Sequence, residues 1–528
     1  MTENTRPKDP NGENSLNTPK KGESTMSSDE KEQKRISRRE FVKGAAVGAA
    51  GVAAAGVLAS CAQEATPCPT PEVIKETVEV PVEVIKEVEL KPWLPDKWDK
   101  EADVVVVGAG GAGLCAAIEA ADAGASVIVL EKTSSLLTSS TAVRGETKSP
   151  PSMKEPFEDF MKIGENVNDP ELVRTYTDNA LDTVNLLKSL GVKYEDPFTT
   201  PTAMVTILAE AAEAKGAQIL LDTSAERLVV DYEDQVLGIT SLGGGGKQFV
   251  KARKGVVICT GGFGRNPALL EQSRRGLSKV LPFCGLGHNG DGHNMAWSLG
   301  AGSRDMQYVM PTFGTHPQSA ITGVRVNQTF YFSGAIIVNR GGKRFVNESY
   351  SYKLVGVAAL GQTDGIGFQI FDQKIFDAAN PRGATLELLV KADTIEELAS
   401  KINVPPETLK DTLDKYNSYV DAGLDLEFGR IFFKEYDDPL KPIVKINTPP
   451  FYAFESMGVI LGTYCGITIN KDLQVINVYG EVIPRLYAAG EVVGGVHGVN
   501  YISGTAVGKA LIFGRVAGKN AAALAPWA

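Results

Sequence analysis

Apolar runs separated by glycines and polar turns mark the regular elements that follow residue 100. Val104–Val107 is a β-branched run bounded by glycine, which predicts a strand buried on both faces of a parallel sheet. The next apolar stretch, Ala112–Ala123, predicts a helix, and Ser126–Leu130 predicts a second strand. The pattern therefore predicts a strand–helix–strand unit at the start of the folded part.

Helix and strand patterns alternate after this unit. Helical periodicity covers Pro156–Glu165 and Asp169–Leu190, and the small polar segment Thr138–Gly145 is expected to be a loop. Gly243–Gly246 is expected to be a hairpin turn, because no helix follows it. The expected strands of this region are Gln218–Leu221, Ala225–Tyr232, Gln235–Ser241, Gln248–Lys251 and Val256–Cys259.

Two helices are expected further along. Thr394–Glu397 forms a capping box that opens one helix. The next helix carries an apolar stripe that predicts core packing, made of Leu409, Leu413, Tyr416 and Val420.

The glycines inside the first unit have the spacing of a dinucleotide site. Gly108, Gly110 and Gly113 form G-x-G-x-x-G, which permits a tight turn, a close approach of backbone to a pyrophosphate, and close packing of helix on strand. The helix N-terminus would face the phosphates. Glu131 ends the second strand, where an acceptor for ribose hydroxyls is needed. Because strand, helix and acid all accompany the glycines, this interpretation is favoured over ordinary glycine turns.

Composition limits the class of protein. The chain has 528 residues, 43% of them hydrophobic, which is enough for about two domains plus appendages. A net charge of −10, without a basic cluster, argues against nucleic acid as a partner. Six scattered cysteines argue against a disulfide framework, and Cys115 and Cys259 are expected in the core. No C-x-x-C-H haem motif, cluster ladder or metal site is predicted.

The N-terminal region has the features of an export signal. Residues 1–36 are polar and expected to be disordered. Ser37–Lys43 contains Arg38-Arg39 and precedes a short apolar run to Ala59, which resembles a twin-arginine signal. A membrane-spanning helix is the alternative, but the run is shorter than the roughly 20 strongly apolar residues that one needs. Extracytoplasmic localisation is the prediction.

The signal region, residues 1–61, ends in a lipoprotein-like box. Leu58–Cys61 resembles a cleavage site that would leave Cys61 lipidated as a membrane tether, and simple cleavage after Ala62 is the alternative. Residues 62–100 are rich in Pro, Val and Glu and repeat EVIKE, which predicts a stalk. An added edge strand is the other interpretation.

Five motifs in order carry a resemblance that covers residues 101 to the end. They are ADVVVVGAGGAGL, Glu131, VVICTGGFGRN, NRGGKRFVNE and LYAAGEVVGGVHG. Together they resemble the flavoprotein superfamily of fumarate reductases and 3-ketosteroid dehydrogenases. The resemblance implies an α/β fold, in which a Rossmann-type FAD-binding domain (101–305 and 449–528) is interrupted by an α+β capping domain (306–448). It also implies non-covalent FAD.

The resemblance implies a set of cofactor-binding residues. The backbone from Gly504 to Val507 opens a helix, expected at Val507–Ala517, whose N-terminus suits the negative charge of reduced flavin. The implied contacts are Gly108, Gly110, Gly111, Gly113, Glu131, Lys132, Thr141, Thr260, Gly261, Gly262, Gly490, Glu491, Thr505, Ala506 and Val507.

The residues that hold fumarate in the family are replaced here. The proton-donor and clamping arginines fall on Tyr352 and Tyr501, and the histidine of HTMGG falls on Gly462. A second histidine, a glutamate and another arginine fall on Thr312, Gln328 and Tyr331. Two carboxylates need fixed cations, so fumarate reduction is not expected.

The replacements resemble the catalytic tyrosines of 3-ketosteroid dehydrogenases, and GTYCGI resembles their GT-x-GG-L. Tyr501, helped by the Gly504 N–H, is expected to polarise a carbonyl, and Tyr352 to exchange the α-proton. A neighbouring phenol such as Tyr331 could lower the Tyr352 pKa from its usual value of about 10. The alternative is that these tyrosines only line a pocket or pack. NYISGTAVG replaces the longer Pro/Gly-rich turn of steroid enzymes, so a steroid substrate is not implied.

Three functions stay open, all for a small-molecule substrate or a redox partner. The first is exchange of a hydride and a proton across the carbonyl-activated C=C or C–C bond of a ketosteroid-like or other apolar enone, with reduction favoured over dehydrogenation. Electrons would pass through a separate partner such as a quinol-linked cytochrome, because no second dinucleotide fold is visible. The second is reduction of an acrylate-type acid anchored by Arg144 or Arg325. The third is a flavin electron-transfer lipoprotein without chemistry of its own.

Overall fold

The strand predicted at Val104–Val107 lies in the middle of a sheet of eight strands. The computed structural model describes residues 94–144, 157–195, 199–430, 444–502 and 504–527. The strand is part of β1, which pairs in parallel with β2 on one side and β6 on the other, while β4 and β5 continue the sheet from β6 in antiparallel pairing. The eight strands are β1 (Lys100–Val107), β2 (Val127–Leu130), β3 (Gln218–Leu220), β4 (Thr223–Val230), β5 (Val236–Gly243), β6 (Gly246–Ile258), β15 (Gln474–Ile476) and β16 (Val482–Ala488).

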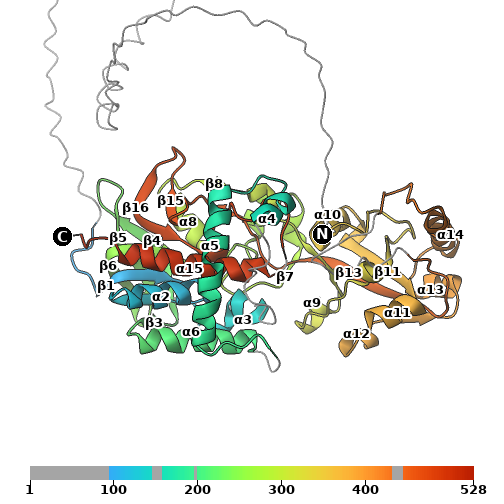
Figure 1. The fold of residues 1–528 in the computed structure, drawn as a ribbon, viewed down its shortest axis with the longest axis horizontal. Coiled ribbons are helices and arrows are strands. Elements are labelled where there is room, and N and C mark those ends of the chain that lie inside the picture. Colours follow the sequence, from blue (N-terminus) through green and yellow to red (C-terminus); the bar gives the residue numbers. More distant parts are fainter. Residues whose placement is uncertain (1–93, 145–156, 196–198, 431–443, 503, 528) are drawn as a thin grey trace, which may run out of the picture. The chain divides into compact units, whose positions relative to one another are not determined.

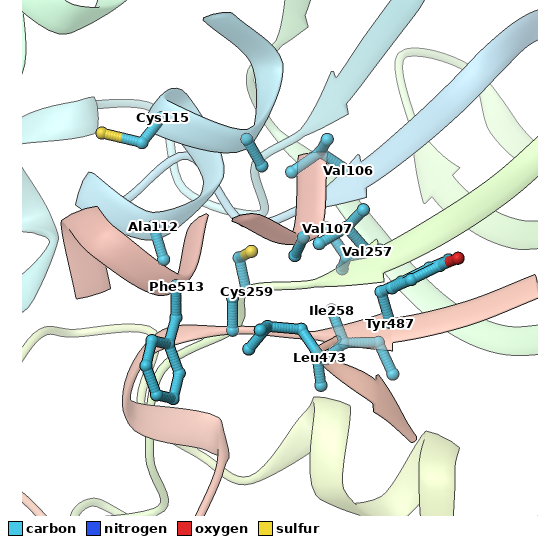
Figure 2. Packing of buried hydrophobic residues seen from close by; sticks show 14 of the residues in the cluster. Val106, Val107, Ala112, Cys115, Val257, Ile258, Cys259, Leu473, Tyr487 and Phe513 are labelled. Carbon is cyan, nitrogen blue, oxygen red and sulfur yellow. The ribbon is translucent and has the colours of Figure 1, made fainter. Parts of the chain in front are cut away.

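The β-branched composition of the central strands explains their burial. All residues of β1 from Ala102 to Val107 are buried, as expected for a strand covered on both faces. Figure 2 shows Val106 and Val107 close to Val257 and Ile258 of β6, with Phe513 among the side chains that complete the cluster. Cys115 and Cys259 are buried thiols of this core, as predicted.

Two helices with small residues at their interface pack beside each other on this sheet. They are α2 (Gly111–Asp122) and α15 (Thr505–Ala522) (Figure 1). A Cβ on Gly514 would lie 2.1 Å from the Ala112 carbonyl oxygen, and one on Gly518 would lie 2.2 Å from that of Ala116. The glycines are therefore required for the close approach of the helices. The other helices of this part are α3 (Ser140–Arg144), α4 (Phe157–Ile163), α5 (Pro170–Ser189), α6 (Pro201–Ala214), α7 (Pro267–Ser273) and α8 (Asp291–Trp297).

A second, largely antiparallel sheet has its own core. Its strands are β7 (Leu281–Pro282), β9 (Thr312–Thr315), β10 (Ile336–Val338), β11 (Ile366–Asp372), β12 (Val390–Ala392) and β13 (Phe451–Ile460). The helices of this part are α9 (Ser319–Thr322), α10 (Tyr352–Leu360), α11 (Gln373–Ala379), α12 (Ala384–Glu387), α13 (Ile395–Lys401) and α14 (Pro406–Ala422) (Figure 1). The strands β8 (Ser303–Arg304) and β14 (Gly466–Ile467) form a separate two-stranded antiparallel sheet.

The predicted helices of the second part are present. Thr394 caps α13 by accepting a hydrogen bond from the Glu397 N–H at 3.1 Å. The apolar stripe of α14 faces the second core, where Leu409, Leu413 and Tyr416 are buried. The mixed α/β fold class is confirmed. Two strands of the second sheet, β7 and β13, lie outside residues 306–448.

Two local predictions are wrong. The strands expected at 248–251 and 256–259 form one strand, β6, because its central charged residues find partners: Arg253 Nη2 lies 3.0 Å from Asp103 Oδ1, and Lys254 Nζ donates to the Ala522 carbonyl at 2.8 Å. The loop expected at 138–145 contains α3. Its start is held by Ser139 Oγ, which accepts from the Ala142 N–H at 3.3 Å.

Several predictions lie outside the described residues. They are the export signal, the lipidation of Cys61, most of the stalk, and the Arg144 side chain. Within the described ranges, no helix combines the length and apolarity that crossing a membrane requires.

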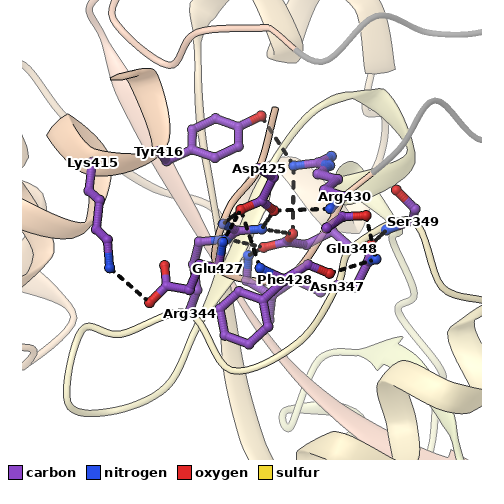
Figure 3. A network of polar contacts seen from close by, with 12 residues as sticks. Arg344, Asn347, Glu348, Ser349, Lys415, Tyr416, Asp425, Glu427, Phe428 and Arg430 are labelled. Atoms are coloured by element: carbon purple, nitrogen blue, oxygen red, sulfur yellow. Dashed lines mark hydrogen bonds and ion pairs between the residues drawn. The ribbon is translucent and has the colours of Figure 1, made fainter. Parts of the chain in front are cut away.

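A buried ionic network holds the segment that precedes α10. Arg344 Nη2 lies 2.6 Å from Glu348 Oε2 and 2.7 Å from Asp425 Oδ2, and the three side chains are at most 3% exposed (Figure 3). Burial alone would raise the pKa of Asp425, but the hydrogen bonds and charge of Arg344 lower it to about 2. Glu348 also accepts from the Ile337 N–H at 3.1 Å, which ties the segment to β10.

Candidate active site

A cavity of about 740 Å³ is lined by the glycine turn after β1, by Glu131 after β2, and by residues from segments much later in the chain. It lies against the carboxyl ends of β1 and β2, the loop after β6, and the N-terminal turns of α2 and α15. Ligands in open parallel sheets bind at this edge. The wall brings together these residues selected from the sequence: Gly108, Gly110, Gly111, Glu131, Lys132, Thr141, Thr260, Gly261, Tyr352, Glu491, Tyr501, Gly504, Ala506 and Val507.

The glycine motif has the geometry that each position requires. Gly108 has φ of +97°, and a Cβ there would lie 2.6 Å from the Cys259 carbonyl oxygen. A Cβ on Gly113 would lie 1.8 Å from the Gly108 carbonyl oxygen, so only glycine lets α2 pack on the turn. Gly110 precedes α2 without a side-chain cap, which leaves an N-terminus suited to a phosphate anion.

Glu131 is held at the end of β2 with its carboxylate on the cavity wall. Its Oε2 accepts from the Ala109 N–H at 3.0 Å, and its Oε1 accepts from the Thr133 N–H at 2.9 Å. A carboxylate has about four acceptor sites, so these bonds orient it without exhausting it. Lys132 beside it pairs with Asp291 at 2.5 Å.

A buried ion pair forms another part of the wall. His288 Nδ1 lies 3.5 Å from Glu491 Oε2, and Glu491 Oε1 accepts from the Thr463 N–H at 2.8 Å. Burial opposes both charges, yet the Glu491 charge raises the pKa of His288 to about 10, and the His288 charge lowers the pKa of Glu491 to about 2. The pair therefore stays charged at neutral pH. The sequence did not single out His288.

Five of the residues expected at the site are not on the wall. Gly262 lies behind Glu491, because a Cβ there would be 2.3 Å from Glu491 Oε1. Tyr331 is 1% exposed and packs in the core of the second sheet, between Phe313 and Phe332. The structure therefore does not bring Tyr331 to the cavity. The remaining three are Gly113, Gly490 and Thr505.

Three tyrosines from three segments line the cavity together. We call Tyr352, Tyr464 and Tyr501 the tyrosine cluster. Tyr352 is the first residue of α10, after the N-cap Ser351. Tyr501 accepts a hydrogen bond at its hydroxyl from the Gly504 N–H at 3.0 Å. The ring centroids of Tyr464 and Tyr501 are 4.6 Å apart, within the range of favourable aromatic pairs.

Two residues beside Tyr501, Tyr464 and His497, were not predicted from the sequence to belong to the site. Tyr464 adopts φ of +57°, a costly conformation for a bulky residue that often marks a functional site. Burial raises its pKa well above the usual value. His497 is buried with its ring 5.3 Å from that of Tyr501, its Nε2 lacks a partner within the described part of the chain, and burial lowers its pKa well below 6.5. Both lie inside motifs that were recognised, Tyr464 at the variable position of GT-x-GG-L.

Cationic side chains reach the same cavity. Arg325 Nε donates to Thr315 Oγ1 at 2.9 Å, and its Nη2 donates to Asn327 Oδ1 at 2.5 Å. Arg325 and Asn327 share the wall with Phe313 and Phe332. Lys509, one turn into α15, is on the wall as well, and burial lowers its pKa to about 8.

The fold and the site define a dinucleotide-binding oxidoreductase. A parallel sheet presents a glycine turn and a helix N-terminus to a cavity that also holds groups capable of proton transfer. The chain matches the FAD binding domain over residues 103–200 and 194–507, and it belongs to this family. The glycine cradle, which a Cβ would fill, fits the cofactor, so the cofactor is FAD.

Relatives show the chemistry of the family. The chain is 33% identical over 455 residues to the fumarate reductase (cytochrome) of Shewanella frigidimarina, covering 80% of this chain and 77% of that protein. It is 31% identical to the urocanate reductase of Eggerthella lenta, with coverage of 82% and 77%. The solved 3-ketosteroid-Δ4-(5α)-dehydrogenase of Rhodococcus jostii RHA1 has a TM-score of 0.66 and 26% identity, with coverage of 82% and 100%. The protein is an FAD-dependent oxidoreductase acting on C=C bonds.

Proposed function

We propose that the protein reduces the carbonyl-activated C=C bond of an apolar, ketosteroid-like enone. The observation that carries the proposal is the Tyr501 hydroxyl, held at 3.0 Å by the Gly504 N–H on the wall that also bears Tyr352. An enone needs one donor on its oxygen and one acid at its α-carbon. Two tyrosines from separate segments supply both.

Each residue has a distinct role in the proposal. When bound, FAD supplies the hydride for the β-carbon. Tyr501 donates its O–H to the carbonyl oxygen, and Gly504 orients that hydroxyl by donating its N–H to it. Tyr352 gives its proton to the α-carbon. Phe313, Phe332 and Leu461 supply an apolar wall that excludes water.

The proposed function predicts which compounds reoxidise the reduced protein. We expect anaerobically reduced flavoprotein to regain its oxidised flavin spectrum on addition of cyclic enones, because the tyrosine cluster offers neutral donors for a neutral carbonyl. The measurement is stopped-flow absorbance with matched enones, acrylates and saturated ketones, the last as the control. If neither enones nor acrylates reoxidise the flavin, the proposal is refuted, and the protein is better explained as an electron-transfer flavoprotein.

A second candidate is reduction of an acrylate-type acid, as the likeness to urocanate reductase suggests. Arg325 favours it, because a guanidinium on the cavity wall can bind a carboxylate. If this candidate is right, acrylates reoxidise the protein, and Arg325→Met raises their KM about 10- to 100-fold. That factor corresponds to the free energy lost with one hydrogen bond to a charged group. Enone reoxidation that Arg325→Met leaves unchanged, with inert acrylates, excludes it.

We also propose that the enzyme acts outside the cytoplasm as a lipoprotein. The support is the twin-arginine and lipoprotein-like motifs around Arg38-Arg39 and Cys61. With no NADH there, electrons would come from a separate partner such as a quinol-linked cytochrome, which favours the reductive direction. Mass spectrometry of the mature protein from membranes is expected to show a lipid on Cys61. An unmodified N-terminus at Gln63 would exclude the tether.

A further inference from the structure

A lysine side chain is buried directly behind the tyrosine cluster. Lys353 follows Tyr352 on α10 and is 1% exposed. Its Nζ lies 4.2 Å from the ring centroid of Tyr464 and 5.8 Å from that of Tyr501. It donates a hydrogen bond to the Met310 carbonyl oxygen at 3.2 Å. Neither the glycine motif nor the resemblance drew attention to this residue.

Burial of the Lys353 ammonium at this position lowers the stability of the fold. A buried ammonium without a carboxylate partner loses hydration that one carbonyl does not replace, and among the described residues no carboxylate forms an ion pair with its Nζ. The two aromatic faces compensate in part through cation–π attraction. A charge kept at such a cost against the rings of Tyr464 and Tyr501, which share the cavity wall with Tyr352, points to a role in the reaction.

We propose that Lys353 is a positioning residue whose charge stabilises the phenolate left in the tyrosine cluster when a tyrosine gives its proton to substrate. The inference rests on the proposed function. In that step the O–H bond of Tyr352 breaks, a C–H bond forms at the α-carbon, and the electron pair stays on the phenolate oxygen, which water reprotonates. A cation held in a low-dielectric site stabilises that anion far more than it would in water.

The charge of Lys353 depends on pH near neutrality. Burial lowers the pKa of Lys353 to about 7, opposed by the Glu491 carboxylate and reinforced by Arg325. The other titratable neighbours are Tyr464, Tyr501 and His497, whose own pKa Lys353 helps to lower. The stabilisation is therefore present while Lys353 is protonated and is lost as the pH rises through about 7.

The test compares holoenzyme variants across the neutral pH range. We expect Lys353→Met to lower kcat about 10- to 100-fold on the acid side, to change KM little, and to lose the alkaline limb of the profile. Lys353→Arg keeps a charge at all accessible pH, so it should restore activity on the acid side and also lack the limb. The exposed Lys343→Met is the matched control and should behave as wild type. Wild-type kcat and pH profile in Lys353→Met would overturn the proposal.

A second measurement does not depend on turnover. In holoenzyme carrying ¹³C-labelled lysine, one resonance should titrate near pH 7 and be absent from Lys353→Met. A Lys353 that stays neutral throughout the range would overturn the proposal. Failure of the proposed function looks different: no acceptor reoxidises the wild-type flavin, while the lysine resonance still titrates.

Discussion

Tyr352→Phe is expected to retain its flavin and to lose turnover by about 10²- to 10⁴-fold, the usual worth of a general acid. The substitution removes only the hydroxyl, so the ring still fills its place at the start of α10 and on the cavity wall. The loss should appear in kcat and kcat/KM alike, because the proton is transferred in the transition state.

The measurement is steady-state reduction of the enone that best reoxidises the wild-type protein, together with the flavin absorbance of each variant. Tyr350→Phe is the matched control: this tyrosine lies two residues earlier and is 48% exposed. We expect it to keep wild-type rates. Turnover by Tyr352→Phe within about threefold of wild type would end the assignment of Tyr352 as the acid.

Arg344→Met is expected to lower the free energy of unfolding by about 3–5 kcal/mol, because it leaves the buried carboxylates of Glu348 and Asp425 without their cation. The ion pair between Arg344 and Asp425 contributes to the free energy of unfolding at neutral pH. Since the pKa of Asp425 is depressed from 3.8 to about 2, its contribution is present above pH 3.8 and is lost as the pH falls through about 2. Denaturant unfolding at neutral pH, followed by tryptophan fluorescence, measures the change.

The network of Figure 3 offers its own control. Lys415 lies 3.3 Å from Glu427, and its side chain is 54% exposed. A surface pair of this kind contributes about 0–1 kcal/mol, so Lys415→Met should leave stability nearly unchanged. Equal effects of the two variants would show that burial of the Arg344 pair adds nothing to stability.

Local patterns predicted the regular elements well. The run at Val104–Val107 and the glycines after it specify their structure through neighbours a few residues away, and β1 and α2 form accordingly. The predictions failed where partners lie far along the chain. β6 continues through Arg253 and Lys254 because Asp103 forms an ion pair with Arg253, and the Ala522 carbonyl in the last turn of α15 accepts a hydrogen bond from Lys254. Rules based on neighbouring residues cannot predict these contacts.

The site shows the same division. Tyr352 and Tyr501 both lie on the cavity wall, and each follows one of the recognised motifs within four residues along the chain. Tyr331 also lies near one of these motifs along the chain, but it is part of the core of the second sheet. The direction of a side chain within a short helical turn depends on what packs against it, which the motif does not encode.

The sequence by itself therefore determined the α/β class, the glycine turn before α2 and the acid at the end of β2, because strand periodicity and glycine geometry act over short distances. Only the tertiary structure decided that the ring of Tyr464 packs against that of Tyr501 and that the ammonium of Lys353 lies against both rings. The contacts of Lys353 join segments more than a hundred residues apart, and their electrostatic consequences arise from burial that exists only after folding.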